Sequence, residues 1–229
     1  PDLARRQDGR VPVEVLLENR QGYQRTFFLS RLLLSLSHNL SFSTPLSLYF
    51  EPSVSSSLLI SYLDLFAQLD LRKNDADRYD QVRPTKGALI SADVQLAGFV
   101  IGGDANDVKL QPELRWYASL AKGFVLAGRV AVGLLYSDNY GESLDSAIPT
   151  REVLHKIGDD ARRAEVNRDV GLLTKRGLFS GGPNTNRGYG FNEIAPHRVV
   201  SDEGLRLLDP DAIGGRTRWE TSIELSSNE

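Results

Sequence analysis

Hydrophobic and polar residues alternate with a period of two along most of this chain. The clearest run is 216–225, where Arg218, Glu220 and Glu224 lie on one face and Trp219 lies on the other. Because successive side chains of a strand point to opposite faces, the run predicts a strand with one polar and one apolar side. The same alternation recurs at 62–72, 87–97, 108–117 and, more weakly, 124–136.

Three further segments have strand character. We predict strands over 32–42 and 46–54, and 11–18 also alternates. Turn-forming residues separate the runs at 74–80, 102–106, 121–123 and 138–141. Strands of about ten residues joined by turns are typical of a transmembrane barrel and predict an all-β, antiparallel fold.

One segment breaks this rhythm. Residues 149–170 are highly charged, and Val153, Leu154 and Ile157 recur at roughly helical spacing. We interpret the segment as a long surface loop that carries a short helix.

Alternation alone leaves two architectures open. A soluble β-sandwich or lipocalin-like barrel and a transmembrane β-barrel both place apolar and polar residues on opposite faces. Two details favour the membrane. The polar faces mix both charge signs, as a wet lumen would, and aromatic residues sit near strand ends, as in interfacial girdles. These aromatic residues are Trp116, Phe124, Tyr136 and Trp219.

The amino-acid composition disfavours several functional classes. The net charge of −3 and the pI near 5.7 disfavour a nucleic-acid partner, which a basic stripe would mark. The chain has no cysteine, so neither a disulfide framework nor a thiolate site is expected. It begins at Pro1, contains no methionine and shows no signal peptide, which predicts a mature or partial segment.

Catalytic motifs are missing from the sequence. It has no nucleophile elbow, P-loop, zinc-protease motif or dinucleotide fingerprint, and its three histidines are far apart. Asp104, Asn106 and Asp107 match part of a calcium loop but lack its remaining spacing and terminal glutamate, so we interpret them as a polar turn. We therefore expect no enzyme, no metal site and no cofactor.

The most informative segment is 180–191, which is dense in glycine, proline and asparagine and places one arginine among them. It resembles the glycine-pair and Arg-Gly-Tyr signature of the bacterial surface antigen superfamily, the outer-membrane assembly factors of the BamA and TamA type. The residues that carry this resemblance are Gly181, Gly182, Arg187, Gly188 and Tyr189.

Three other pieces match the family in order and spacing. They are 176–180 before the glycine pair, Gly214-Gly215 followed by Ser222-x-Glu224, and 84–87, which reads Pro-Thr-Lys-Gly where a strand begins. The resemblance covers about 84–229 well and the first 80 residues poorly. Two features depart from the family: Thr185 replaces the usual serine, and the charged segment 149–170 is long.

The resemblance implies a sixteen-stranded transmembrane β-barrel, of which this chain supplies a part. Residues 31–229 would form the barrel portion, with 177–215 as an extracellular or lumenal loop. Residues 1–30 would be either the end of a periplasmic domain or the first barrel strand. With about eight strand candidates and one after the motif, the chain is expected to lack the closing strands.

The resemblance also assigns roles within the loop. The loop would tuck into the lumen, where Arg187 would meet a carboxylate of the wall, and Glu224 matches that position. Glu220 and Arg218 share its face and would extend the network. Gly188 would let the backbone turn, and Tyr189 would pack on the wall.

The function implied is assembly and insertion of other proteins into a bacterial or organelle outer membrane. Its partners would be unfolded outer-membrane clients, the lipid bilayer and accessory lipoproteins or periplasmic proteins, without nucleic acid. A client strand would join an exposed barrel edge by β-augmentation. Two alternatives stay open: a dedicated protein-secretion pore of the same superfamily, and a soluble β-barrel binding module.

Overall fold

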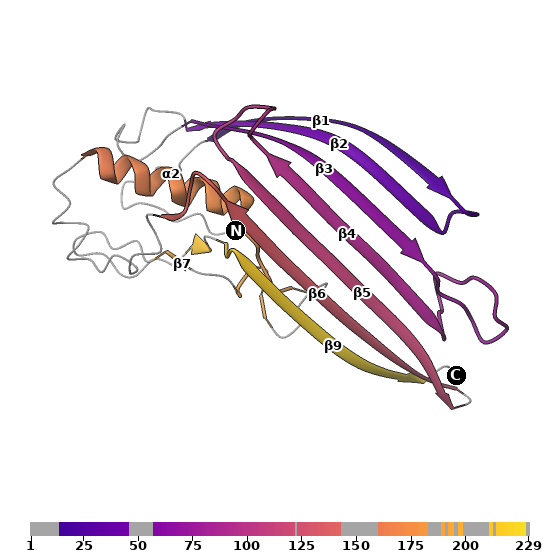
Figure 1. Ribbon diagram of the computed structural model, residues 1–229. Helices are drawn as coiled ribbons and strands as arrows, with labels where there is room; N and C mark the ends of the chain where they lie inside the picture. Colours follow the sequence, from indigo (N-terminus) through magenta and orange to yellow (C-terminus); the bar gives the residue numbers. More distant parts are fainter. Residues whose placement is uncertain are drawn as a thin grey trace.

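The computed structural model is dominated by one curved antiparallel sheet of seven strands, in the order β1-β2-β3-β4-β5-β6-β9 (Figure 1). The structure describes residues 14–45, 57–121, 123–142, 160–182, 189–190, 192–194, 197–198, 211–212 and 214–227. The strands of the sheet are β1 Glu14–Phe27, β2 Leu32–Pro45, β3 Leu58–Asp70, β4 Gly87–Ala97, β5 Asp107–Ala121, β6 Phe124–Ser137 and β9 Thr217–Ser227.

The predicted strands within the described residues are confirmed. Each run of alternating residues forms one strand, and neighbours along the sheet pair antiparallel through their length. The run at 11–18 contributes to β1, which pairs with β2 from Glu14 to Phe27. The predicted strand at 46–54 lies outside the described residues.

The charged segment differs from its prediction. A helix of 17 residues, α2 (Asp160–Arg176), begins late in the segment and continues beyond it. Its last turns are not on the surface, because Leu172 and Leu173 are buried. Two short strands, β7 (His197–Arg198) and β8 (Asp211–Ala212), pair with each other after the helix.

The strand register separates the two faces of the sheet. Gln95 of β4 pairs with Asp64 of β3 and Lys109 of β5, and Ala131 of β6 pairs with Glu113 of β5 and with Glu220 of β9. Because paired residues point the same way, these positions define a polar face. The alternate positions form an apolar face.

The apolar face is exposed over its whole width. Leu36, Leu65, Ile90, Leu114 and Ile223 come from five different strands and expose 40–74% of their surface. A contiguous apolar surface of this extent marks contact with a membrane or another protein. Within the described residues, no helix is long and apolar enough to span a membrane.

One cross-strand pair of the apolar face explains a glycine in the middle of β6. Trp116 of β5 pairs with Gly128, and a Cβ built on Gly128 would lie 2.2 Å from the indole ring. The indole therefore covers the glycine backbone, as in aromatic rescue of strand glycines.

A charge on the apolar face is expected to destabilise the protein if that face meets lipid. Leu65→Arg, near the middle of β3, should lower the free energy of unfolding in a bilayer by about 2–4 kcal/mol. The measurement is urea-induced unfolding in vesicles, followed by the mobility of unboiled samples in a gel. Gln68→Arg, which places the same charge on the polar face of β3, is the control and should cost far less. Equal losses would contradict the assignment of the faces.

Candidate functional site: a helix and loop docked on the polar face

Helix α2 packs its C-terminal half against the polar face, at the end where β3 begins and β4 ends (Figure 1). Leu172 and Leu173 join a buried cluster with Leu58 and Ile60 of β3 and Leu135 of β6. These strand residues belong to the polar face by register, so the helix supplies them with an apolar partner. A small hydrophobic core thus forms at one end of an otherwise polar surface.

The last residue of α2, Arg176, is held by a buried carboxylate of the sheet. Its Nη2 lies 2.6 Å from Asp107 Oδ1 and its Nε lies 3.0 Å from Asp107 Oδ2, a bidentate pair between side chains 4% and 0% exposed. Nη1 donates to Gln95 Oε1 at 2.9 Å. The guanidinium also stacks 4.5 Å from the ring centroid of Tyr62. Three strands therefore recognise one arginine.

Tyr140, just after β6, completes this network. Its hydroxyl donates to Asp107 Oδ2 at 2.7 Å, and the side chain is buried. Burial, together with the adjacent carboxylate, raises the pKa of the Tyr140 hydroxyl well above its ordinary value. Tyr140 therefore stays a donor to Asp107, whose charge receives hydrogen bonds from both Arg176 and Tyr140.

The chain leaves α2 through a tightly packed glycine. Gly177 N donates to Leu173 O at 2.7 Å, which ends the helix, and a Cβ on Gly177 would lie 2.8 Å from Gly214 Cα. Leu178 and Gly215 then exchange two backbone hydrogen bonds of 2.8 Å. The segment after the helix is thereby joined to the segment that enters β9.

The glycine pair of the motif opens a hairpin-like turn. Ser180 and Ile194 exchange backbone hydrogen bonds of 3.0 and 3.2 Å, and Gly182 N donates to Tyr189 O at 3.1 Å. Gly181 has a φ of +112°, and a Cβ there would lie 2.2 Å from Gly190 O, so a side chain is excluded.

The predicted arginine follows the glycine pair in sequence, but Arg187 and Gly188 lie outside the described residues. Tyr189, the next described residue, is 56% exposed. The packing of Tyr189 on the wall and the pairing of Arg187 with Glu224 therefore stay predictions.

Arg218 and Glu220, two other predicted residues, belong to a ladder of charges across the wall. Arg129 of β6 donates to Glu113 of β5 and to Glu220 of β9, at 2.9 Å each, and Arg218 Nε lies 3.7 Å from Glu220. Arg218 also donates to Phe179 O at 3.2 Å. The ladder therefore reaches the segment that leads into the glycine-rich turn.

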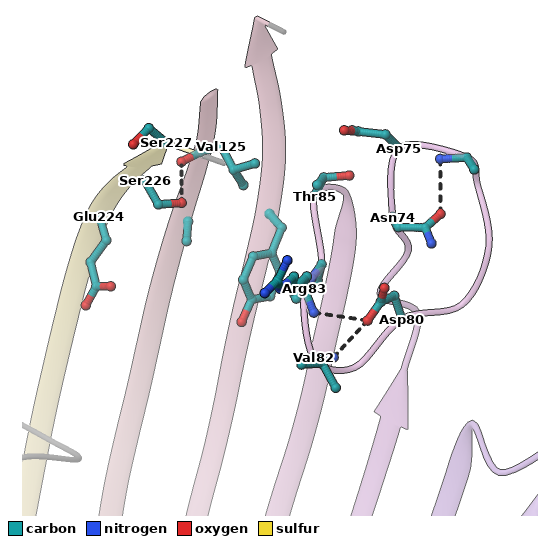
Figure 2. Close-up of a pocket in the computed structure, with 14 residues that line it drawn as sticks. Asn74, Asp75, Asp80, Val82, Arg83, Thr85, Val125, Glu224, Ser226 and Ser227 are labelled. Atoms are coloured by element: carbon teal, nitrogen blue, oxygen red, sulfur yellow. Dashed lines mark hydrogen bonds between the residues drawn. The ribbon is translucent and has the colours of Figure 1, made fainter. Parts of the chain in front are cut away.

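Glu224 lies further along β9, away from α2. It faces the same side as Glu220 and pairs by register with Ala127. With Thr85, Asn74 and Asp80 it lines a hollow of about 780 Å³ between β9 and the loop after β3 (Figure 2). It lies six positions after Arg218, which is about 20 Å along a strand.

The sequence patterns do not predict the Arg176–Asp107–Tyr140 network. The family resemblance covers Arg176 but implies no role for it. The polar-turn interpretation is wrong for Asp107, which is the fully buried first residue of β5. The sequence does offer one signal for this site. Asp107 is an acidic residue directly before the predicted strand 108–117.

Comparison with known families decides the architecture. Residues 61–228 match the model of the Omp85 superfamily domain. The chain belongs to the Omp85 superfamily. No curated protein matches it.

Membership confirms the resemblance and the partial β-barrel fold. Omp85 proteins are outer-membrane proteins that act in outer-membrane protein assembly or in secretion. The polar face of this Omp85 sheet is therefore lumenal, and its apolar face meets lipid. The match also begins at residue 61, earlier than the motifs had indicated.

The Arg176–Asp107 pair yields a stability prediction for this Omp85 protein. Arg176→Met should lower the free energy of unfolding by about 3–5 kcal/mol, because it leaves the Asp107 carboxylate buried without its counter-charge. Asp107→Leu should lower the free energy of unfolding by a similar amount. The double variant should lose much less than the sum of the two single losses, which a double-mutant cycle in urea measures.

The matched control is Arg78→Met, which removes an exposed arginine from the loop after β3. It should change stability little. Strictly additive losses at 176 and 107 would show that the two side chains do not act as a pair.

Proposed function

We propose that this protein is an outer-membrane insertase, which helps nascent β-barrel proteins fold and enter the membrane. Superfamily membership supports assembly or secretion, and the motif loop favours assembly through its resemblance to the assembly factors. No nucleotide or cofactor is needed, since the energy of insertion comes from client folding. A client strand would pair with an exposed barrel edge, where backbone hydrogen bonds supply affinity without sequence specificity.

The observation that carries this proposal is the attachment of the loop to the lumenal wall. Arg176, the Leu178–Gly215 bridge and Arg218 fix the entry of the loop beside β9. From this anchored entry, the loop would carry the Arg-Gly-Tyr motif into the barrel. Within this proposal the loop keeps the barrel in a shape competent to receive clients.

Arg187 would then pair with Glu224. The eight residue steps from Phe179 to Arg187 would span at most about 26–29 Å if fully extended, and the hydrogen bond between Gly182 and Tyr189 shortens that reach. Glu224 lies about 20 Å beyond the point where Phe179 meets Arg218. The distance is within reach only if the loop runs along β9. Glu220 is closer; Arg129 donates to its Oε2, while its Oε1 is buried without a hydrogen bond among the described residues, so Glu220 is the competing carboxylate.

The pairing predicts a specific pattern in gel mobility. The intact protein, extracted in detergent and left unboiled, should migrate faster than the boiled form because the barrel stays folded. Arg187→Ala and Glu224→Ala should each weaken the fast band, and the double variant should lose no more than either one, because each single change already breaks the pair.

Glu220→Gln is the control for the choice of carboxylate. It should weaken the band through loss of the wall ladder, and its effect should add to that of Arg187→Ala. If Arg187→Ala instead combines non-additively with Glu220→Gln and additively with Glu224→Ala, the arginine binds Glu220.

Depletion of the protein separates insertase from secretion pore. We expect the abundance of several unrelated outer-membrane proteins in isolated membranes to decrease at the same time. Mass spectrometry of the membranes measures it. Restoring expression of the wild-type protein is the control. Loss of one secreted protein from the medium, with outer-membrane proteins unchanged, would overturn the insertase proposal and identify a dedicated pore.

A further inference from the structure

The loop between β4 and β5 ends in an exposed apolar tip. Residues 98–103 read Gly-Phe-Val-Ile-Gly-Gly and contain no polar side chain. Phe99 is 57% exposed and Val100 is 99% exposed. The loop rises from the arrowhead of β4, at the same end of the sheet as α2 (Figure 1).

The tip is held in one shape by backbone hydrogen bonds. Gly98 N donates to Ser61 O at 3.0 Å, and Asp104 N donates to Leu59 O at 2.7 Å, so both ends of the tip continue the ladder with β3. Ile101 N donates to Gly98 O at 2.9 Å. Phe99 adopts a left-handed backbone, with φ of 47°, which a bulky residue rarely does.

The base of the loop is anchored from the lumenal side by α2. Arg168 donates to Asp104 O at 2.8 Å and to Asn139 O at 3.2 Å. Asn139 in turn donates to Asp104 O and accepts from Asn106 N, at 3.0 and 2.8 Å. The apolar tip is therefore presented on a rigid base and does not collapse onto the protein.

The tip of the β4–β5 loop lies next to the lipid-facing side of the sheet. Ser61 points to that side by register, since it pairs with Leu40, yet it is only 2% exposed. Two neighbours cover it: a Cβ built on Gly103 would lie 3.6 Å from Ser61 Cβ, and His38 Nε2 lies 2.9 Å from the Ser61 hydroxyl. Next to the loop, the lipid-facing Leu59 and Leu96 are 38% and 44% exposed.

We propose that Phe99, Val100 and Ile101 insert into the bilayer at the rim of the barrel and act as a lipid-anchored wedge. The tip continues the surface that lipid already covers, and it carries no charge or hydrogen-bonding side chain that a protein partner would read. Acyl chains are the occupant that such a surface fits. The inference rests on the membrane placement of the sheet and not on the choice between insertase and pore.

Site-specific labelling tests the wedge. Because the chain has no cysteine, Val100→Cys provides a unique site within it for the fluorophore NBD. The intact protein would be reconstituted in phosphatidylcholine vesicles with and without spin-labelled acyl chains. Leu96→Cys is the lipid-facing reference. Val82→Cys is the matched control, because Val82 is also apolar and 87% exposed but lies in a charged loop at the other end of the sheet.

The expected result is blue-shifted emission at position 100 and a loss of intensity with spin-labelled lipid comparable to that at position 96. Water-like emission without quenching, as expected at position 82, would overturn the wedge. Blue-shifted emission without quenching would also overturn it, since the tip would then contact protein. A failure of quenching at position 96 as well would instead refute the membrane placement of the sheet.

Discussion

The buried ion pair between Arg176 and Asp107 is the interaction on which the lumenal arrangement depends. Two opposite charges withdrawn from water are stable only when their geometry and remaining hydrogen bonds are complete, and here Gln95, Tyr62 and Tyr140 complete them. The pair fixes the end of α2 on the wall. Every later contact of the loop starts from that fixed point, because Gly177 follows Arg176 directly and packs against Gly214.

Helix α2 links two regions that are far apart in sequence. Its Arg168 supports the base of the β4–β5 loop, while its Arg176 sets the start of the motif loop two turns later. A change in the seating of the helix would therefore affect both the β4–β5 loop and the start of the motif loop.

The alternating pattern predicted the strands well because period two is a local property of the chain. Runs such as 87–97 coincide with β4, and the face assigned to Arg218, Glu220 and Glu224 agrees with the register. The helix was harder to predict, since its buried apolar residues, Leu172 and Leu173, lie past the charged segment. Asp107 and Arg176 are 69 positions apart, so no local pattern connects them; the packing of α2 on the sheet brings them together.

The contacts along β9 also limit where the motif arginine can act. Leu178 is fixed at Gly215 and Phe179 at Arg218, so the segment that leads into the motif lies beside the first residues of β9. Backbone hydrogen bonds then join 180–182 to 189–194, so the two described ends of the glycine-rich segment lie side by side. Glu220 accepts from Arg129 through Oε2 only, and its Oε1 is buried without a hydrogen bond in the described part of the chain, so Glu220 and Glu224 are the two carboxylates of this face between which the proposed variants decide.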